Sequence, residues 1–197
     1  SSDNLTFTYE AKSLPYPIDT SYYDNEKHTQ ADALSVIPFM DEMNYEGLSV
    51  SGLSDGYYGL TIGGEFIGRF TARELERGIN MALLQNTPQY KQAMKIRQMN
   101  EERWLKERKM REFYWVEYNL MRKTGMLWAC NEAAVDTLRK YRPHDIFLQW
   151  NGALWLQYMH KGIREDCVNE QQDLVNQIYE QNKPIPLRIE IKKFTDL

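Results

Sequence analysis

The chain has 197 residues, of which 42% are apolar and 26% are charged, and its net charge is -4. These fractions are typical of globular proteins and exclude an intrinsically disordered or collagen-like chain. Proteins that bind nucleic acid usually carry an excess of basic residues, whereas here 28 Asp and Glu outnumber 24 Lys and Arg. We therefore expect no nucleic-acid partner. No apolar run approaches the roughly 20 residues of a membrane-spanning helix, so we expect no membrane span.

The first predicted elements are a strand and an extended segment. Residues 4–10 alternate between apolar and polar side chains, which predicts a half-buried strand. Pro15 and Pro17 predict an extended segment after it, because each proline fixes its own φ and restricts its predecessor. Residues 19–32 are polar without a period, which predicts a surface loop.

A three-stranded meander is the next predicted feature. Gly63-Gly64 lies between alternating segments, and two such glycines favour a tight hairpin with positive φ angles. Thr71 and Glu74 have the spacing of a capping box, so we expect a helix over residues 72–84. The three alternating segments of the meander are residues 48–53, 57–62 and 65–70.

A long helix is predicted to begin at Pro88. Thr87 is a suitable N-cap, proline suits the first helical position, and no further Gly or Pro occurs before Gly125. Gly125 is a natural residue to end that helix. Three more helices are predicted over about 126–141, 145–161 and 164–182, and a final strand over 184–194.

The order of these elements predicts an α+β fold with a small antiparallel sheet, a long helix and about four further helices. The sheet would contain the N-terminal strand, the hairpins at 48–70 and the returning C-terminal strand. We expect one unit over residues 1–197, because the last strand would return to the first sheet. Its parts would be a β-rich part (1–87), a helical part (88–183) and the returning strand (184–194).

The three histidines, His28, His144 and His160, have no recognisable catalytic context in the sequence. We place His28 in the polar loop, His144 at a helix start and His160 at a helix end. Cys130 and Cys167 are both predicted within helices, where nothing would activate a thiol, so we expect no Cys-His enzyme. Their spacing leaves open whether they form a disulfide or remain two buried thiols.

No pattern for a metal or cofactor occurs in the sequence. His-Glu-x-x-His, paired Cys-x-x-Cys and an Asp-rich calcium loop are all absent. The glycines between 52 and 68 are not followed by Lys-Ser/Thr, so they indicate hairpins and not a phosphate loop. We expect neither a metal nor a cofactor.

The basic stretch from Arg103 to Arg111 is predicted to be a solvated helix face. Glu102 with Lys106, and Glu107 with Arg111, have the favourable i,i+4 order for ion pairs.

Five tryptophans could in principle form a platform for sugar rings. Four of them lie in apolar helical contexts, which favour core packing. Trp104 is flanked by charges, so we expect it to be exposed, and it is the candidate binding residue. The other four are Trp115, Trp128, Trp150 and Trp155.

Two stretches resemble bacterial SGNH/GDSL-type hydrolases (esterase- or lipase-like acylhydrolases), in the region that follows the catalytic domain. The first is GLSDGYYGLTIGGEFIGRFTARELERGINMA (52–82), and the second is NTPQYKQA (86–93). The similarity extends over roughly residues 5–110. The Gly-Asp-Ser and Asp-x-x-His blocks that carry the family's catalysis do not occur here, so no catalytic residue is carried over.

The resemblance implies a non-catalytic C-terminal accessory region of such a hydrolase. Its partner would be an upstream hydrolase domain of the same protein, and its substrate an ester, with carbohydrate esters included. The chain begins at Ser1 without an initiator Met, so we expect a mature product or internal segment of an exported bacterial protein, periplasmic or secreted.

Two alternatives stay open at this point. One is a self-standing module that binds a carbohydrate or a protein through exposed aromatic rings. The other is an enzyme built on a pair of carboxylates that only the tertiary structure would reveal.

Overall fold

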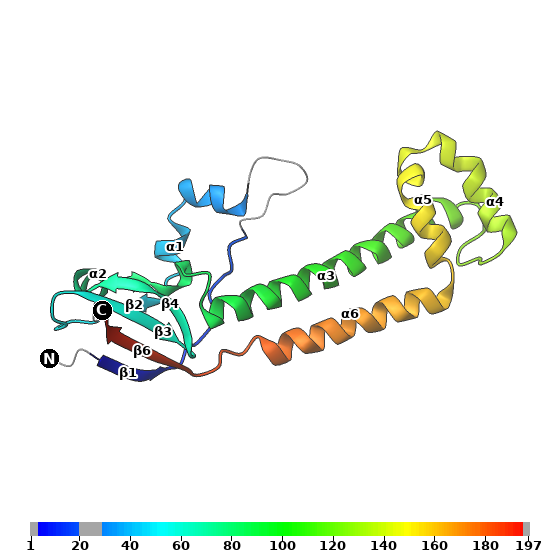
Figure 1. Ribbon diagram of the computed structural model, residues 1–197. Helices are drawn as coiled ribbons and strands as arrows, with labels where there is room; N and C mark the ends of the chain where they lie inside the picture. Colours follow the sequence, from blue (N-terminus) through cyan, green and yellow to red (C-terminus); the bar gives the residue numbers. More distant parts are fainter. Residues whose placement is uncertain (1–3, 20–28, 195–197) are drawn as a thin grey trace. The chain divides into compact units, whose positions relative to one another are not determined.

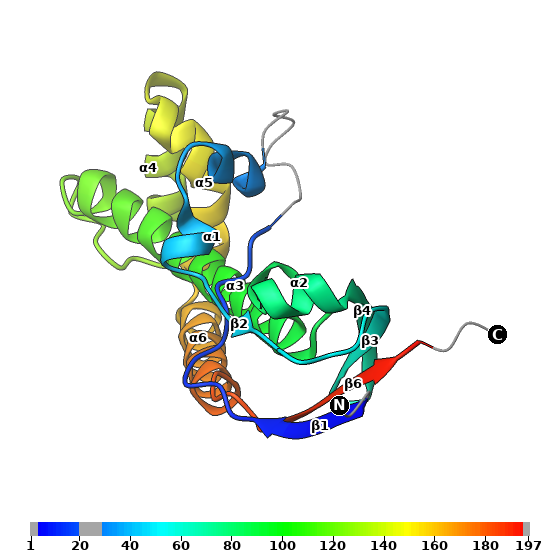
Figure 2. The ribbon, with the colours of Figure 1, turned by 90° about the vertical axis from the view of Figure 1, so that its left-hand side faces the viewer.

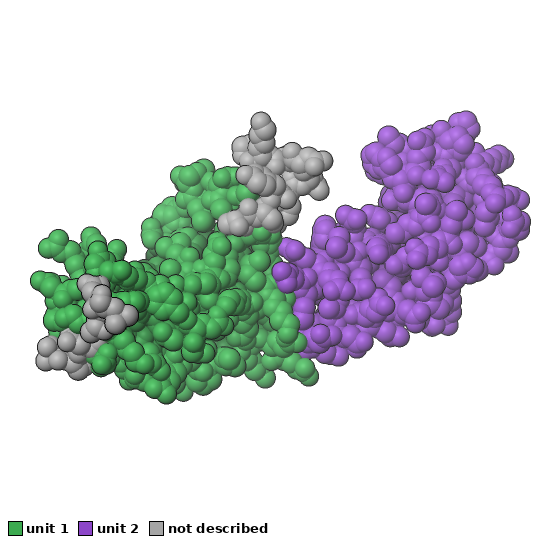
Figure 3. Space-filling view, in the orientation of Figure 1, with its two compact units in different colours: residues 1–97, 180–197 green, residues 98–179 purple. Residues whose placement is uncertain are grey.

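The computed structural model describes residues 4–19 and 29–194 (Figure 1). It divides into two compact units, residues 1–97 with 180–197 and residues 98–179 (Figure 3). The predicted α+β class is confirmed. The expectation that the chain is one cooperative unit stays a prediction.

The first unit contains a four-stranded antiparallel sheet in the order β1-β6-β3-β4 (Figure 2). The strand that returns from the end of the chain pairs with the first strand on one side, as in Leu5 opposite Ile191, and with β3 on the other. The predicted return is therefore confirmed. The strands are β1 (Asn4–Tyr9), β3 (Tyr57–Ile62), β4 (Glu65–Thr71) and β6 (Leu187–Lys193).

The turn between β3 and β4 is the predicted two-residue hairpin. Gly63 and Gly64 have φ angles of 58° and 86°, in the region that favours glycine. The register shifts between Leu60 and Thr61, which produces a β-bulge in this pair.

The prediction of a strand over residues 48–53, the first segment of the meander, is wrong. Only β2 (Gly47–Leu48) is a strand, and it pairs with β5 (Ile79–Asn80) in a separate two-stranded sheet. Gly52 has a φ of 78°, which breaks the extended conformation that a longer strand needs.

The helix after the meander is shorter than predicted. Its capping box is confirmed, because Thr71 Oγ1 accepts the Glu74 N–H while the Glu74 carboxylate accepts the Thr71 N–H. However, α2 (Ala72–Arg77) ends at Gly78, whose φ is 92°. The chain then forms β5 and the 3₁₀ helix η2 (Met81–Leu83).

The polar segment predicted as a loop is only partly described, since residues 20–28 lie outside the described residues. Within the described part, residues 30–35 form the 3₁₀ helix η1 (Gln30–Ser35), which corrects the prediction. Thr29 and Asp32 make a capping box there, a local signal that the polar composition obscured. The short helix α1 (Phe39–Glu42) follows.

The core of the first unit lies on one face of the sheet. Alternate residues of the two central strands are fully or nearly fully buried, and Leu75 of α2 is buried with them. Figure 2 shows α2 on the concave side of the curved sheet. The strand residues of this core include Tyr58, Leu60, Ile62, Leu187, Ile189 and Ile191.

The long helix α3 (Pro88–Val116) begins as predicted, with the Thr87 hydroxyl accepting the Tyr90 N–H at 3.3 Å. It continues into η3 (Glu117–Met121), which is a π-helix. The sequence did not predict the π-helix, since no Gly or Pro marks it.

The remaining helices follow the predicted order. α4 (Glu132–Tyr141) starts later than residue 126, because Trp128 has a φ of 61° and Asn131 is the N-cap. The others are the 3₁₀ helix η4 (Arg142–His144), α5 (Ile146–Tyr158) and α6 (Lys161–Gln181). Among the described helices none is long and apolar enough to cross a membrane.

Candidate functional site

A cavity of about 350 Å³ lies within the second unit, residues 98–179. Aromatic rings and polar groups meet there, the combination that small-molecule sites use. The polar groups are an amide, an ammonium, an imidazole and a carboxylate. The residues that carry this chemistry are Trp115, Asn119, Lys123, Tyr141, His144 and Asp145.

The π-helix η3 supplies one side of this cavity. Asn119 donates its side-chain N–H to the Trp115 carbonyl at 3.0 Å, and the Thr124 hydroxyl donates to the Leu120 carbonyl at 3.0 Å. These local bonds satisfy carbonyls near the end of the helix. π-helical segments inside α-helices are frequent at functional sites, which makes this one a reason to examine the cavity.

The start of α5 contributes a carboxylate, that of Asp145, to the lining of this cavity. Asp145 is its N-cap, and Asp145 Oδ1 accepts the N–H groups of Phe147 at 2.8 Å and of Leu148 at 3.2 Å. This confirms the predicted helix start at Asp145. His144 belongs to η4 just before it and is exposed.

Aromatic rings extend from the cavity over α5. The ring centroids of Trp115 and Phe147 are 5.3 Å apart, and those of Phe147 and Trp150 are 5.6 Å apart. Trp150 is 66% exposed, so the outer end of this row is open to solvent.

A second aromatic group surrounds Trp128 in the loop after η3. The rings of Phe113, Tyr114 and Tyr118 lie 5.8–6.3 Å from the Trp128 ring. Trp128 is 45% exposed and Tyr118 is 47% exposed.

The prediction that four tryptophans belong to the core is wrong for two of them. Trp155 is fully buried and Trp115 is half-buried, but Trp128 and Trp150 are exposed. Apolar residues are spread around α5 and through the loop that contains Trp128, so the sequence did not indicate which side faces solvent.

Trp104 is exposed, as the sequence predicted. The Arg111 guanidinium lies 5.7 Å from its ring centroid, within the range of a cation–π interaction. Its role in binding stays a prediction.

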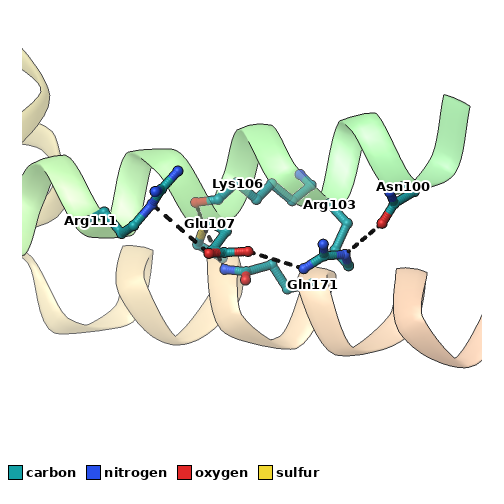
Figure 4. Close-up of polar contacts among 7 residues, drawn as sticks. Asn100, Arg103, Lys106, Glu107, Arg111 and Gln171 are labelled. Carbon is teal, nitrogen blue, oxygen red and sulfur yellow. Dashed lines mark hydrogen bonds and ion pairs between the residues drawn. The ribbon is translucent and has the colours of Figure 1, made fainter. Parts of the chain in front are cut away.

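The charged face around Trp104 contains the ion pairs that the sequence predicted. Lys106 lies 3.9 Å from Glu102, and Arg111 lies 3.9 Å from Glu107. Arg103 bridges Glu107 and Asn100 at 3.1 Å each, so one continuous row of polar contacts runs along α3 (Figure 4).

Glu117 is a buried carboxylate in the second unit, and it is only 1% exposed. Its two oxygens accept the indole N–H of Trp155 and the backbone N–H of Trp128, both at 2.8 Å. It thereby joins η3, the following loop and α5. The only indication in the sequence that Glu117 is buried is that it is the one acid within the apolar stretch 113–121.

The two cysteines are free thiols and form no disulfide, but the alternative of two buried thiols holds for Cys167 alone. Cys167 is buried within α6, as expected. Cys130, however, is exposed and lies in the loop before α4, which corrects its predicted place inside a helix. Cys130 Sγ lies 3.3 Å from His160 Nδ1, a pair that sequence reasoning did not expect.

The histidines are otherwise placed much as predicted. His160 lies between the end of α5 and the start of α6, and His144 lies before α5. His28 lies outside the described residues. Within residues 4–19 and 29–194, no three His, Cys, Asp or Glu side chains form a group that could hold a metal ion.

A pair of acids lines another cavity of the second unit, of about 520 Å³, which bears on the carboxylate alternative. Glu165 and Asp166 lie there with Lys161 and Arg164, and Glu165 is paired with Lys161 at 3.2 Å. The two acids are sequence neighbours on α6. The alternative of an enzyme built on a pair of carboxylates, for which the sequence named no residues, stays a prediction.

Gln89 and Glu46 form a buried polar cluster in the first unit. Gln89, which is 3% exposed, donates through Nε2 to both carboxylate oxygens of Glu46 at 3.3 Å. Burial raises the pKa of Glu46. Burial, followed by the Glu46 charge, raises the pKa of Tyr9 to about 12.

Comparison with known proteins relates this chain to an enzyme that acts on diltiazem. Residues 94–183 match the family described as the diltiazem deacetylase C-terminal helical domain. The helical part of the chain resembles that domain. A comparison with curated proteins gave no match.

A solved structure extends the similarity beyond the helices. It is BT4096, described as a gut microbial diltiazem-metabolizing enzyme, with 37% sequence identity and a TM-score of 0.88. The match covers 97% of this chain and 43% of BT4096. The chain therefore spans less than half the length of that enzyme.

These findings overturn the resemblance to SGNH/GDSL-type hydrolases. They relate the chain to diltiazem deacetylase and show no link to the SGNH group. The quoted stretches consist largely of local signals: hairpin glycines, a capping box and a Thr-Pro helix start. The backbone needs those residues for its turns and helix ends, so they are weak markers of a family.

Proposed function

We propose that this chain is a non-catalytic accessory region of an ester hydrolase that removes acetyl groups, and that its partner is a catalytic domain of the same protein. The observation that carries the proposal is the match of 97% of this chain to 43% of BT4096 at 37% identity. The helical-domain family at residues 94–183 supports it, since that family is described as C-terminal in a deacetylase.

The cavity beside η3 suits binding better than bond cleavage. Trp115 and Tyr141 offer ring faces, and Asn119 and Lys123 offer hydrogen-bond donors. The Asp145 carboxylate already accepts two backbone N–H groups. The cavity would hold the ring part of an acetyl ester, carbohydrate esters included, and so help to shape the substrate site.

The first experiment compares the 197-residue chain with the longer protein that contains it, using p-nitrophenyl acetate. The longer protein should hydrolyse this ester and the isolated chain should not. Hydrolysis by the isolated chain that disappears in Cys130→Ser or another single variant would show that the chain is itself catalytic.

A second experiment tests the cavity in the longer protein. Tyr141→Ala should raise KM for an acetylated ring substrate several-fold with less than a twofold change in kcat, because it removes a contact made equally in ground and transition states. Tyr179→Ala, an exposed tyrosine on α6, is the matched control and should change neither constant. Equal kinetics for both variants would contradict a role for the cavity.

A second candidate function is a self-standing module that binds a carbohydrate or a protein, and the exposure of Trp150 favours it. Retention of the isolated chain on a polysaccharide affinity gel, weakened by Trp150→Ala or Trp104→Ala, would support this module over the accessory role.

We also propose that the protein is bacterial and is exported, to the periplasm or outside the cell. Fractionation of the producing cells would test this, with recovery from the cytoplasm as the contrary result.

A further inference from the structure

The Cys130 thiol and the His160 imidazole meet at a junction of the second unit. Cys130 lies in the loop before α4, and His160 lies between α5 and α6. Their Sγ and Nδ1 atoms are 3.3 Å apart, although 30 positions separate them in the chain. Both side chains are exposed, so a small molecule can reach them.

The backbone on the cysteine side is fixed by hydrogen bonds to its neighbours. The Ala129 N–H donates to the Met126 carbonyl at 2.9 Å, and the Asn131 side chain caps α4 by accepting the Ala134 N–H at 3.0 Å. Cys130 lies between these two anchored residues.

The backbone on the histidine side is held by Arg164. Its guanidinium donates to the carbonyls of Tyr158 and Met159 at 2.6 and 2.8 Å, and it lies 4.8 Å from the Phe113 ring centroid. The Arg164 N–H also donates to the His160 carbonyl at 3.4 Å. His160 is thus fixed at the first turn of α6.

One feature of this junction favours a nucleophilic sulfur. The imidazole nitrogen lies within hydrogen-bond reach of the Cys130 thiol and can accept its proton. Cys167 offers a contrast inside the same unit, because its sulfur contacts the Lys106 carbonyl and the Gln171 amide.

We propose that Cys130 and His160 form a nucleophilic thiol–imidazole dyad, and that this dyad is a site of covalent oxidation by hydroperoxides. The Cys130 proton passes to His160 Nδ1, and the sulfur attacks the terminal hydroxyl oxygen of the peroxide. The S–O bond forms as the O–O bond breaks, and the departing alkoxide takes the proton from His160. Cys130 becomes a sulfenic acid, and the hydroperoxide is reduced to an alcohol, or hydrogen peroxide to water.

This inference does not depend on the proposed function. An accessory region or a binding module could equally contain such a thiol, and hydrolysis of an ester is not part of the step.

The test measures the reaction of the 197-residue chain with hydrogen peroxide, trapped by dimedone, and separately with iodoacetamide. Intact mass and peptide mapping give the rate at each cysteine. Cys130 should react at least tenfold faster than Cys167, and His160→Gln should slow Cys130 at least fivefold with both reagents. His144→Gln, which changes another exposed histidine, should leave both rates unchanged.

His160 is exposed, so His160→Gln should retain the fold, and tryptophan emission checks this. His160→Asn serves as a second variant that also lacks a base. Equal Cys130 rates in the wild type and in both His160 variants would overturn the dyad. A dimedone adduct that fails to form at Cys130 would overturn the oxidation.

Discussion

Glu46 is an acid whose environment disfavours its charge. It lies beside Tyr9 and the buried Gln89, and Gln89 Nε2 donates to both of its oxygens. Burial raises the pKa of Glu46 above its ordinary value of 4.5, although the hydrogen bonds from Gln89 and Tyr9 partly oppose this effect. The folded state therefore binds the Glu46 proton more tightly than the unfolded state does.

This linkage predicts how Glu46→Gln changes the pH dependence of stability. A raised pKa means that the contribution of Glu46 is fully present below about pH 4.5 and is lost as pH rises through the folded-state value. The free energy of unfolding of Glu46→Gln, relative to wild type, should therefore increase between pH 4.5 and pH 7.5.

Urea unfolding at several pH values within this window measures the effect. Glu76→Gln, which changes an exposed glutamate of the same unit, is the control substitution. A difference between Glu46→Gln and wild type that does not vary with pH would show that the pKa of Glu46 is not raised in the folded state.

At the scale of elements, the β3–β4 hairpin depends on two glycines with different surroundings. Both have positive φ angles, so any side chain there costs about 1–2 kcal/mol in backbone strain. A Cβ at Gly63 would lie 3.3 Å from Leu187 and from Pro88, whereas a Cβ at Gly64 would have no atom within 4 Å.

Gly63→Ala should therefore lower the free energy of unfolding more than Gly64→Ala does. We expect a loss of about 1–2 kcal/mol for Gly64→Ala, from strain alone, and a larger loss for Gly63→Ala. Urea titration of both variants provides the comparison. An equal or larger loss for Gly64→Ala would mean that the contacts to Leu187 and Pro88 do not matter.

For the whole molecule, the open question is whether the two compact units unfold together. The division falls within α3 and α6, so each of these helices contributes residues to both units. Helix formation is cooperative along a continuous segment, which favours a shared transition.

Tryptophan emission offers a selective probe, because all five tryptophans lie between residues 98 and 179. We expect its urea midpoint to coincide with the midpoint from the backbone amide NMR signals of Ile62 and Ile189 in the sheet. Coincident transitions are the usual sign of two-state unfolding. Midpoints that differ by more than their errors would indicate two separately folding domains.

The sequence by itself determined the features that depend on local backbone chemistry. The Gly63-Gly64 turn, the capping box at Thr71 and the start of α3 at Pro88 follow from residues within a few positions of one another. Such signals act over one turn of the chain, and the sequence contains all of their partners. The stretches that resembled SGNH/GDSL-type hydrolases consist largely of these same local signals, so they were poor markers of a family.

Only the tertiary structure decided which distant residues meet and which rings face solvent. Cys130 meets His160, and Glu117 accepts the Trp155 indole N–H, because helices far apart in the chain pack together. Trp150 is exposed on a helix whose apolar residues are spread around its circumference, so their pattern did not reveal its exposure. These outcomes depend on three-dimensional packing, which no local pattern of residues specifies.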